Sequence, residues 1–218
     1  EPELVSQCVK AMVQATSLPV TVKCRIGIDD QDERETLFQF VGTVANAGCR
    51  TFIIHARKAW LKGLSPKENR SVPPLNYELV YELKQAHPDL EIILNGGIKT
   101  LAESRDHLTH LDGVMMGREA YSNPGILATV DQDLYGDPRP VLSAMEILEN
   151  FRPFLVEQLA AGVPLKNFAR HMLGLFNGQP GAKAFRRHLS ENMSDPIAGL
   201  DLLDEALGRL STKQLEIA

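Results

Sequence analysis

The sequence is poor in cysteine, and its cysteines form no metal-binding or disulfide pattern. Among 218 residues, only Cys8, Cys24 and Cys49 are cysteines. They make no CxxC pair and have no histidine at ligand spacing, so neither a zinc site nor a disulfide framework is expected. Free thiols are typical of a reducing compartment. We therefore expect a cytoplasmic protein that holds no metal.

Long apolar runs are missing as well. No stretch reaches the roughly 18 apolar residues that a membrane-spanning helix needs, and the acidic start Glu1-Pro2-Glu3 does not resemble a signal peptide. We expect no association with a membrane. The first residues resemble the start of a helix rather than the start of a protein, because no initiator Met and no strand come before them.

Acidic residues are absent from one long segment of an otherwise acidic chain. The net charge is -5, and the 44% hydrophobic and 23% charged residues are typical of a soluble globular protein. Residues 163–190 nevertheless contain five basic residues and no acid, and residues 55–70 contain five with Glu68 alone opposing them. The basic residues are Arg57, Lys58, Lys62, Lys67, Arg70, Lys166, Arg170, Lys183, Arg186 and Arg187. Two such segments indicate either a polyanion-binding surface or ordinary solvated faces.

Apolar strands alternate with amphipathic helices in the first part of the chain. The pattern predicts helix Glu3–Ala15, strand Pro19–Ile26, a helix from Asp32, strand Thr51–His55, helix Asn76–Ala86, a strand from Glu91, a helix from Thr100 and strand Gly113–Met116. Four such units argue for a parallel sheet, either a barrel or a doubly wound sheet. Residues 56–76 have loop composition, and a loop of that length is usually functional or disordered.

The composition changes after the linker Asp137-Pro138-Arg139-Pro140. From Val141 onward apolar residues recur at helical spacing, with breaks at residues 162–164, 178–181 and 195–196. We expect two domains, an α/β domain over residues 1–138 and a small all-α domain of about four helices over residues 139–218. The second basic segment falls on the middle pair of these helices.

Two glycine turns follow the last two predicted strands. Asn95-Gly96-Gly97 and Gly117-Arg118 leave backbone N–H groups without a Cβ that would hold an anion away. In a (β/α)8 barrel the loops after strands 7 and 8 commonly form a phosphate site, and Arg118 would add a bidentate cation. Each turn alone could be an ordinary strand-to-helix connection. Their pairing across one helix favours a phosphate site.

The other two predicted strands also carry polar residues near their ends. Lys23 lies in an apolar strand, where a lysine is costly to bury without an anionic partner, and alternation places it on one face with Thr21 and Arg25. His55 ends the next strand and could be structural. Together with the two glycine turns, these residues lie at four successive strand ends, which are the catalytic positions of a barrel.

Four motifs are together similar to those of the tRNA-dihydrouridine synthases. They are VTVKCRIGIDD, FIIHARKAWLKGLSPKENR, ILNGGI and GVMMGREAYSNP. The long loop resembles the A subfamily, which acts at positions 20 and 20a of the tRNA D-loop. The resemblance implies the C-terminal half of a TIM (β/α)8 barrel, strands 5–8, followed by a helical tRNA-binding domain. It implies an oxidoreductase that uses FMN and NADPH to reduce uridine to 5,6-dihydrouridine.

The resemblance also assigns roles by position. It implies FMN contacts at Lys23, His55, Asn95, Gly96, Gly97, Gly117 and Arg118. It implies tRNA contacts at Arg57, Lys67, Arg70, Lys183 and Arg186. A cation such as Lys23 would favour the negative charge of a reduced flavin. The expected partners are tRNA and NADPH. The protein is expected to be a monomer.

The chain departs from the family in lacking its general acid. That residue is a cysteine in a Cys-Pro motif on strand 4, whereas Cys8, Cys24 and Cys49 are not followed by proline and are expected to pack in the core. We therefore expect no catalytic residue here, and a chain that alone is inactive, binds flavin poorly and aggregates.

Two alternatives remain open. A small-molecule FMN barrel of the dihydroorotate or dihydropyrimidine dehydrogenase type would explain the glycines and Lys23, but not the basic segments or the helical tail. A catalytically silent RNA-binding module would suit the missing cysteine, but would leave the flavin-type loops without a purpose.

Overall fold

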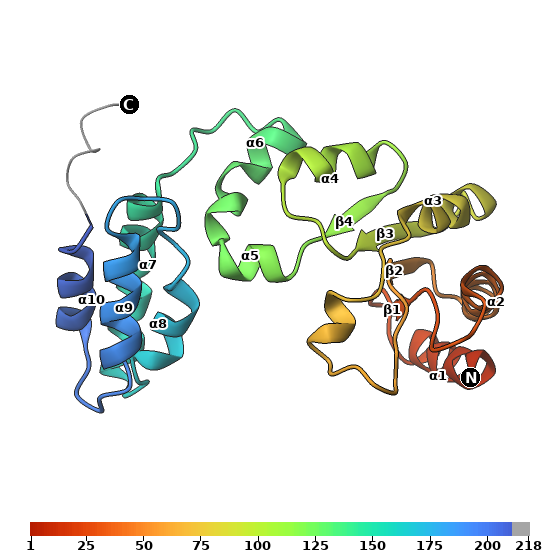
Figure 1. Ribbon diagram of the computed structural model, residues 1–218, viewed down its shortest axis with the longest axis horizontal. Coiled ribbons are helices and arrows are strands. Elements are labelled where there is room, and N and C mark those ends of the chain that lie inside the picture. The colour runs from red at the N-terminus through yellow and green to blue at the C-terminus, as the bar shows by residue number, and fades with distance from the viewer. Residues whose placement is uncertain (211–218) are drawn as a thin grey trace. The chain divides into compact units, whose positions relative to one another are not determined.

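The computed structural model describes residues 1–210 and divides into two compact units (Figure 1). The first unit is Glu1–Gly117, and the second begins at Arg118. The unit boundary follows the fourth strand, whereas the linker at residues 137–140 joins two helices inside the second unit. The domain division at residue 138 stays a prediction, and residues 211–218 of the predicted helical domain lie outside the described residues.

The first unit is built on a parallel sheet. Its strands are β1 (Thr21–Arg25), β2 (Thr51–His55), β3 (Glu91–Asn95) and β4 (Gly113–Met115), hydrogen-bonded in the order β1-β2-β3-β4. They alternate with α1 (Pro2–Ala15), α2 (Glu33–Ala45), α3 (Tyr77–Ala86) and α4 (Leu101–Leu108). The predicted α/β class with a parallel sheet is confirmed. The described strand order follows the chain without the reversal that marks a doubly wound sheet.

The predicted helix starts carry the expected caps. Asp32 Oδ1 accepts a hydrogen bond from the Glu35 N–H at 2.8 Å, and Asn76 Oδ1 accepts one from the Leu79 N–H at 3.2 Å. Thr100 and Glu103 form a reciprocal capping box at the start of α4. Each cap satisfies backbone donors that the first helical turn leaves unpaired, so these short polar sequences fix where three helices begin.

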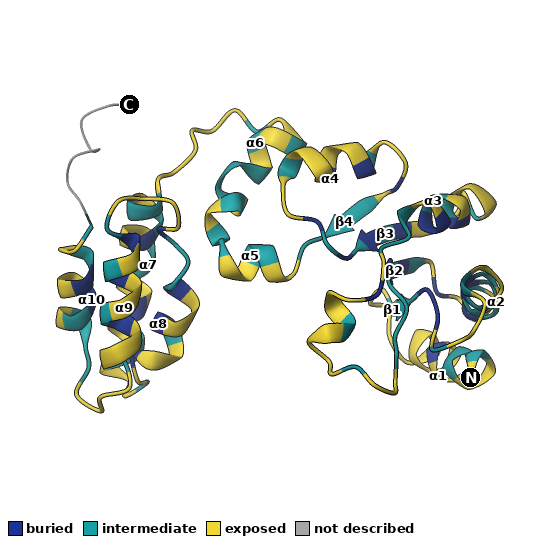
Figure 2. Cartoon of the chain, viewed as in Figure 1, coloured by how far each residue is buried: buried dark blue, intermediate teal, exposed yellow. Residues whose placement is uncertain are grey.

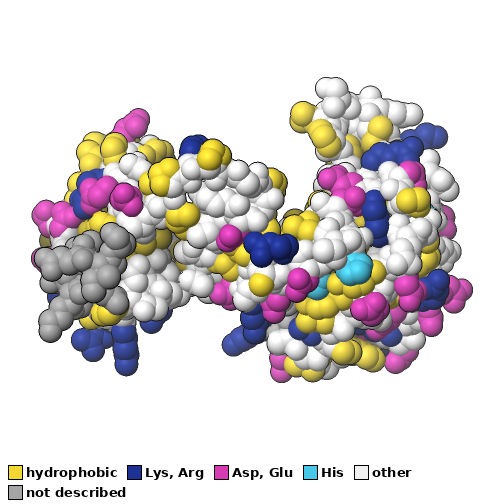
Figure 3. All heavy atoms as spheres, turned by 90° about the horizontal axis from the view of Figure 1, so that it is seen from above, with side chains coloured by type: hydrophobic (Ala, Val, Ile, Leu, Met, Phe, Trp, Pro, Cys, Tyr) yellow, Lys and Arg dark blue, Asp and Glu magenta, His cyan; other side chains and the backbone are white. Residues whose placement is uncertain are grey.

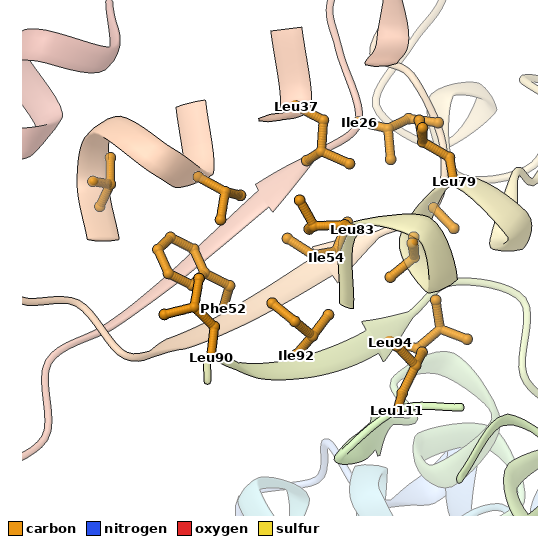
Figure 4. Close-up of a cluster of buried hydrophobic side chains, with 14 of the residues drawn as sticks. Ile26, Leu37, Phe52, Ile54, Leu79, Leu83, Leu90, Ile92, Leu94 and Leu111 are labelled. Atoms are coloured by element: carbon orange, nitrogen blue, oxygen red, sulfur yellow. The ribbon is translucent and has the colours of Figure 1, made fainter. Parts of the chain in front are cut away.

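The apolar core lies on one face of the sheet. Phe52, Ile54, Ile92 and Leu94 are fully buried there against helical side chains such as Leu83 (Figure 4). Residues that alternate with them point to the other face of the sheet, where the strand residues are half-buried or exposed except for His55, which is buried. Figure 2 colours the ribbon by this burial. Val22 and Cys24 pack against the core, which confirms that Thr21, Lys23 and Arg25 share the opposite face.

Helix α1 is only partly buried, and its cysteine departs from the prediction. Val9 is buried, but Leu4 and Met12 remain 56% and 54% exposed, and Cys8 is exposed. The prediction that Cys8 packs in the core is therefore wrong. The predictions for the other two cysteines are confirmed, because Cys49 is buried and Cys24 packs against the core. Burial raises the pKa of the Cys24 thiol to about 12, so it stays protonated.

The described part of the second unit consists of helices. It begins with α5 (Arg118–Ser122), the 3-10 helix η2 (Pro124–Thr129) and α6 (Val130–Tyr135). Then follow α7 (Ala144–Ala160), α8 (Lys166–Met172), α9 (Ala182–Asn192) and α10 (Leu200–Leu207), separated at the predicted breaks. Their core contains Leu155, Phe176, Phe185 and Leu203. None of the helices up to residue 210 is both long and apolar enough to cross a bilayer.

Candidate functional site

The carboxyl ends of the four strands form a row of aligned residues in the first unit. Arg25 is in register with His55, His55 with Asn95, and Asn95 with Met115. In-register residues of a parallel sheet point to the same face. The strand ends singled out from the sequence therefore meet at one edge, on the face that the helical core does not cover.

Asn95 links three strands at this edge. Its Oδ1 accepts a hydrogen bond from Lys23 Nζ of β1 at 2.9 Å, and its Nδ2 donates to the Met115 carbonyl of β4 at 2.8 Å. The bond to a neutral amide holds the Lys23 ammonium in place without neutralising it. Partial desolvation, followed by repulsion from Arg25, lowers the pKa of Lys23, although its side chain remains accessible. The edge thus presents a fixed cation.

The turn after β3 has a conformation that requires glycine. Gly96 and Gly97 have φ values of +118° and +77°. A Cβ on Gly96 would lie 2.7 Å from His55 Cδ2, and a Cβ on Gly97 would lie 2.6 Å from Leu75 Cδ1. His55 is only 8% exposed, so it cannot easily yield. Among the described residues, no hydrogen bond uses the N–H of Gly96 or Gly97.

The second glycine turn is open. A Cβ built on Gly117 meets nothing within 4 Å, and Gly117 is exposed. Arg118 begins α5 and is the first residue of the second unit. The first unit thus brings Lys23, His55, Asn95, Gly96 and Gly97 to one edge, with Gly117 just beyond the end of β4.

The long loop is held by contacts that the sequence did not reveal. Arg25 Nη1 donates to the carbonyls of Lys58 and Asn69 at 2.8 and 2.9 Å. The Asn69 side chain accepts from the Trp60 N–H and donates to the Trp60 carbonyl, both at 2.7 Å. Arg57 donates to the Pro73 carbonyl. Hydrogen bonds from Arg25 therefore hold the loop against the end of β1.

Cations concentrate on this loop. Desolvation lowers the pKa of Arg25, and repulsion from Arg57 and Arg70 lowers it further. Lys67 and Arg70 are exposed beside the 3-10 turn Glu68–Arg70. Three arginines close enough to perturb one another create a local positive potential that an anionic ligand would relieve.

The second basic segment lies on α8 and α9, as predicted. Lys183 and Arg186 are exposed on α9, and Arg186 Nη1 donates to Asn177 Oδ1 at 2.7 Å. Asn177 Nδ2 in turn donates to the Ser122 carbonyl at 2.7 Å, which ties the end of α5 to the helical bundle. Lys and Arg side chains project from both units, coloured dark blue in Figure 3. Within residues 1–210, no cluster of His, Cys, Asp and Glu could hold a metal ion.

Comparison with known proteins identifies the family. The model of the dihydrouridine synthase family, Dus, matches residues 1–210. The chain belongs to the dihydrouridine synthase family. This membership confirms the resemblance inferred from the motifs around Lys23, His55, Asn95 and Gly117.

Relatives of this dihydrouridine synthase chain carry one name. This chain is 55% identical to the tRNA-dihydrouridine(20/20a) synthase of Yersinia pestis, and the match covers 99% of this chain and 63% of that protein. The Vibrio cholerae protein of the same name is 51% identical over 100% of this chain and 67% of its own length. The Escherichia coli K12 protein is 52% identical over 97% and 62%. The chain thus spans about two thirds or less of these relatives.

Solved structures add little. A crystal structure of mandelate oxidase matches with a TM-score of 0.40 and 14% identity, covering 94% of this chain and 66% of that one. A likeness of this size supports no inference about the site.

Proposed function

We propose that this chain forms part of a flavin-dependent tRNA-dihydrouridine synthase that reduces uridines 20 and 20a in the tRNA D-loop. The observation that carries the proposal is the row of polar strand ends in a chain 51–55% identical to two proteins of that name. Flavin would bind to the first unit, and tRNA would bind to both basic segments.

The first unit has the features expected of half a barrel. Its four described strands are parallel and follow one another in chain order. Helical side chains bury one face, whereas Ile53 and Ile93 on the other face are only half-buried. We propose that the strands of the rest of the protein complete a (β/α)8 barrel and cover this face. The 218-residue chain alone would then bind flavin less well than the full-length protein.

The residues at the sheet edge fit FMN. Gly96 and Gly97 offer N–H groups that the described residues leave unused, and Gly117 has open space where a Cβ would stand. Such groups suit a phosphate. Lys23, held by Asn95, suits the ring system, and His55 supports the turn. When bound, FMN would supply hydride chemistry, with NADPH as its reductant.

The two basic segments suit a folded RNA. Arg57, Lys67 and Arg70 belong to the long loop, and Lys183 and Arg186 belong to α9. Cations of this kind bind phosphates and position the nucleic acid without reading its sequence. A D-loop uridine would then be turned out of its stack to reach the sheet edge. We also propose that the enzyme is cytoplasmic and monomeric.

The experiment that tests the proposal uses the full-length protein that contains this chain. Purified protein is expected to carry FMN and to bind tRNA more tightly than a small pyrimidine such as orotate. A protein that reduces free pyrimidines and ignores tRNA would instead support the small-molecule rival. A protein that binds tRNA but never flavin would support the silent RNA-binding module.

A further inference from the structure

Tyr77, the first residue of α3, contacts the glycine turn after β3. Its hydroxyl donates a hydrogen bond to the Gly96 carbonyl at 2.7 Å. A Cβ on Gly97 would lie 2.9 Å from the same hydroxyl. The tyrosine therefore packs directly beneath the peptide that joins the two glycines.

This hydrogen bond fixes the direction of one backbone donor. In a trans peptide, the carbonyl of one residue and the N–H of the next point in opposite directions. Because the Gly96 carbonyl points to Tyr77, the Gly97 N–H points away from it. Glycine on both sides would let this peptide rotate between two orientations at little steric cost. The Tyr77 hydroxyl selects one of them.

The tyrosine is itself firmly held. Asn76, which caps α3, donates through Nδ2 to Glu33 Oε2 at 2.9 Å, and its N–H donates to the Ala56 carbonyl at 2.8 Å. The ring of Tyr77 meets that of His107 edge-on, with centroids 4.6 Å apart. Desolvation, then the charge of Glu103, raises the pKa of Tyr77, so the hydroxyl keeps its proton at neutral pH.

We propose that Tyr77 is a positioning residue that orients the Gly97 N–H toward the phosphate of the flavin cofactor. The inference rests on the proposed function, because it takes the turn to be the phosphate site. Tyr77 does not touch the ligand in this account. It acts through the peptide, by removing the orientation in which a carbonyl oxygen would face the anion.

The test compares two ligands that differ only in the phosphate. Full-length Y77F protein, stripped of flavin, is titrated with FMN and with riboflavin by flavin fluorescence. We expect FMN affinity to fall about three- to tenfold, the effect of one neutral hydrogen bond, with riboflavin affinity unchanged. The matched control is Y81F on the same helix, whose hydroxyl lies 2.6 Å from His107 Nδ1 instead of bonding to the turn.

The outcomes separate the inference from the proposed function. An equal loss of FMN and riboflavin affinity in Y77F would show a merely structural role and overturn the inference. Unchanged affinity for both ligands would overturn it as well. If the unsubstituted protein binds neither flavin, the proposed function itself fails. An unchanged ratio of the two affinities in Y81F would support the inference, because loss of another half-buried tyrosine hydroxyl from α3 would then not weaken FMN binding.

Discussion

Lys23 and Asn95 are joined by a hydrogen bond of 2.9 Å between Nζ and Oδ1, although β2 lies between their strands. Asn95 is held in turn by the Met115 carbonyl. The relationship places one ammonium group at the edge where the strands end. It also makes the position of that charge depend on a single amide side chain.

Removing the Lys23 charge should make the bound flavin harder to reduce. In K23M we expect the two-electron reduction potential of the flavin to fall by about 30–60 mV, since a nearby cation favours the anionic reduced form. Spectroelectrochemical titration of the full-length protein measures this. K10M, which removes an exposed lysine from α1, is the control and should leave the potential unchanged. Equal potentials in K23M and the unsubstituted protein would remove Lys23 from the flavin site.

The two glycine turns should respond differently to alanine. G96A places a Cβ against His55 at a φ of +118°, so we expect unfolding free energy to drop by about 2 kcal/mol or more. G117A meets open space and should leave stability within about 0.5 kcal/mol while weakening FMN binding. Urea unfolding and flavin titration measure the two effects. A stable G96A protein would contradict the geometry of the turn, and full FMN affinity in G117A would contradict the role of the second turn.

Several features of the fold could be predicted from the sequence, because interactions between residues close together in the chain determine them. Strand Thr51–His55 has its predicted bounds, and Asp32, Asn76 and Thr100 cap their helices as expected. Alternation placed Lys23 and Cys24 on opposite faces. Caps and alternation depend on neighbours within a few residues, so a single sequence reveals them.

Contacts between distant residues were missed. Nothing local indicates that Arg25 binds the carbonyl of Asn69, or that Tyr77 reaches Gly96. The only sequence feature that pointed to the contact between Tyr77 and Gly96 was the position of Tyr77 directly after the helix cap Asn76. The apolar pattern of α1 predicted burial for Cys8, but a pattern says that a face is apolar and not what covers it. Helix α6 was missed because its short sequence has no clear period.

Lys183 and Arg186 should contribute to tRNA binding through phosphates. In K183A/R186A we expect weaker tRNA affinity and a salt dependence of log K that is shallower by about 0.7–0.9 per lost contact. Filter binding across a range of salt concentrations measures the slope. K10A is the control for removal of a surface charge, and K183A alone should show half the change. A double variant that binds weakly with an unchanged slope would indicate damage to the Asn177 contact instead.

Stability should fall in mild acid because of His107. Desolvation lowers the pKa of this buried histidine, so the unfolded chain takes up a proton at a higher pH than the folded one. Unfolding free energy should therefore decline as pH drops below about 6.5, the ordinary histidine value, and level off below the folded-state pKa. Urea titrations at several pH values test this, with H107Q as the comparison. A decline of the same size in H107Q would assign the effect to other groups.

The most direct measurement is the conversion of uridine in tRNA. Full-length protein containing this chain is incubated with NADPH and tRNA that lacks dihydrouridine, and the digested RNA is analysed by mass spectrometry. The account predicts a gain of two hydrogens on D-loop uridines 20 and 20a, with FMN released when the protein is denatured. Unmodified D-loop uridines, from a protein shown to bind both FMN and this tRNA, would contradict it.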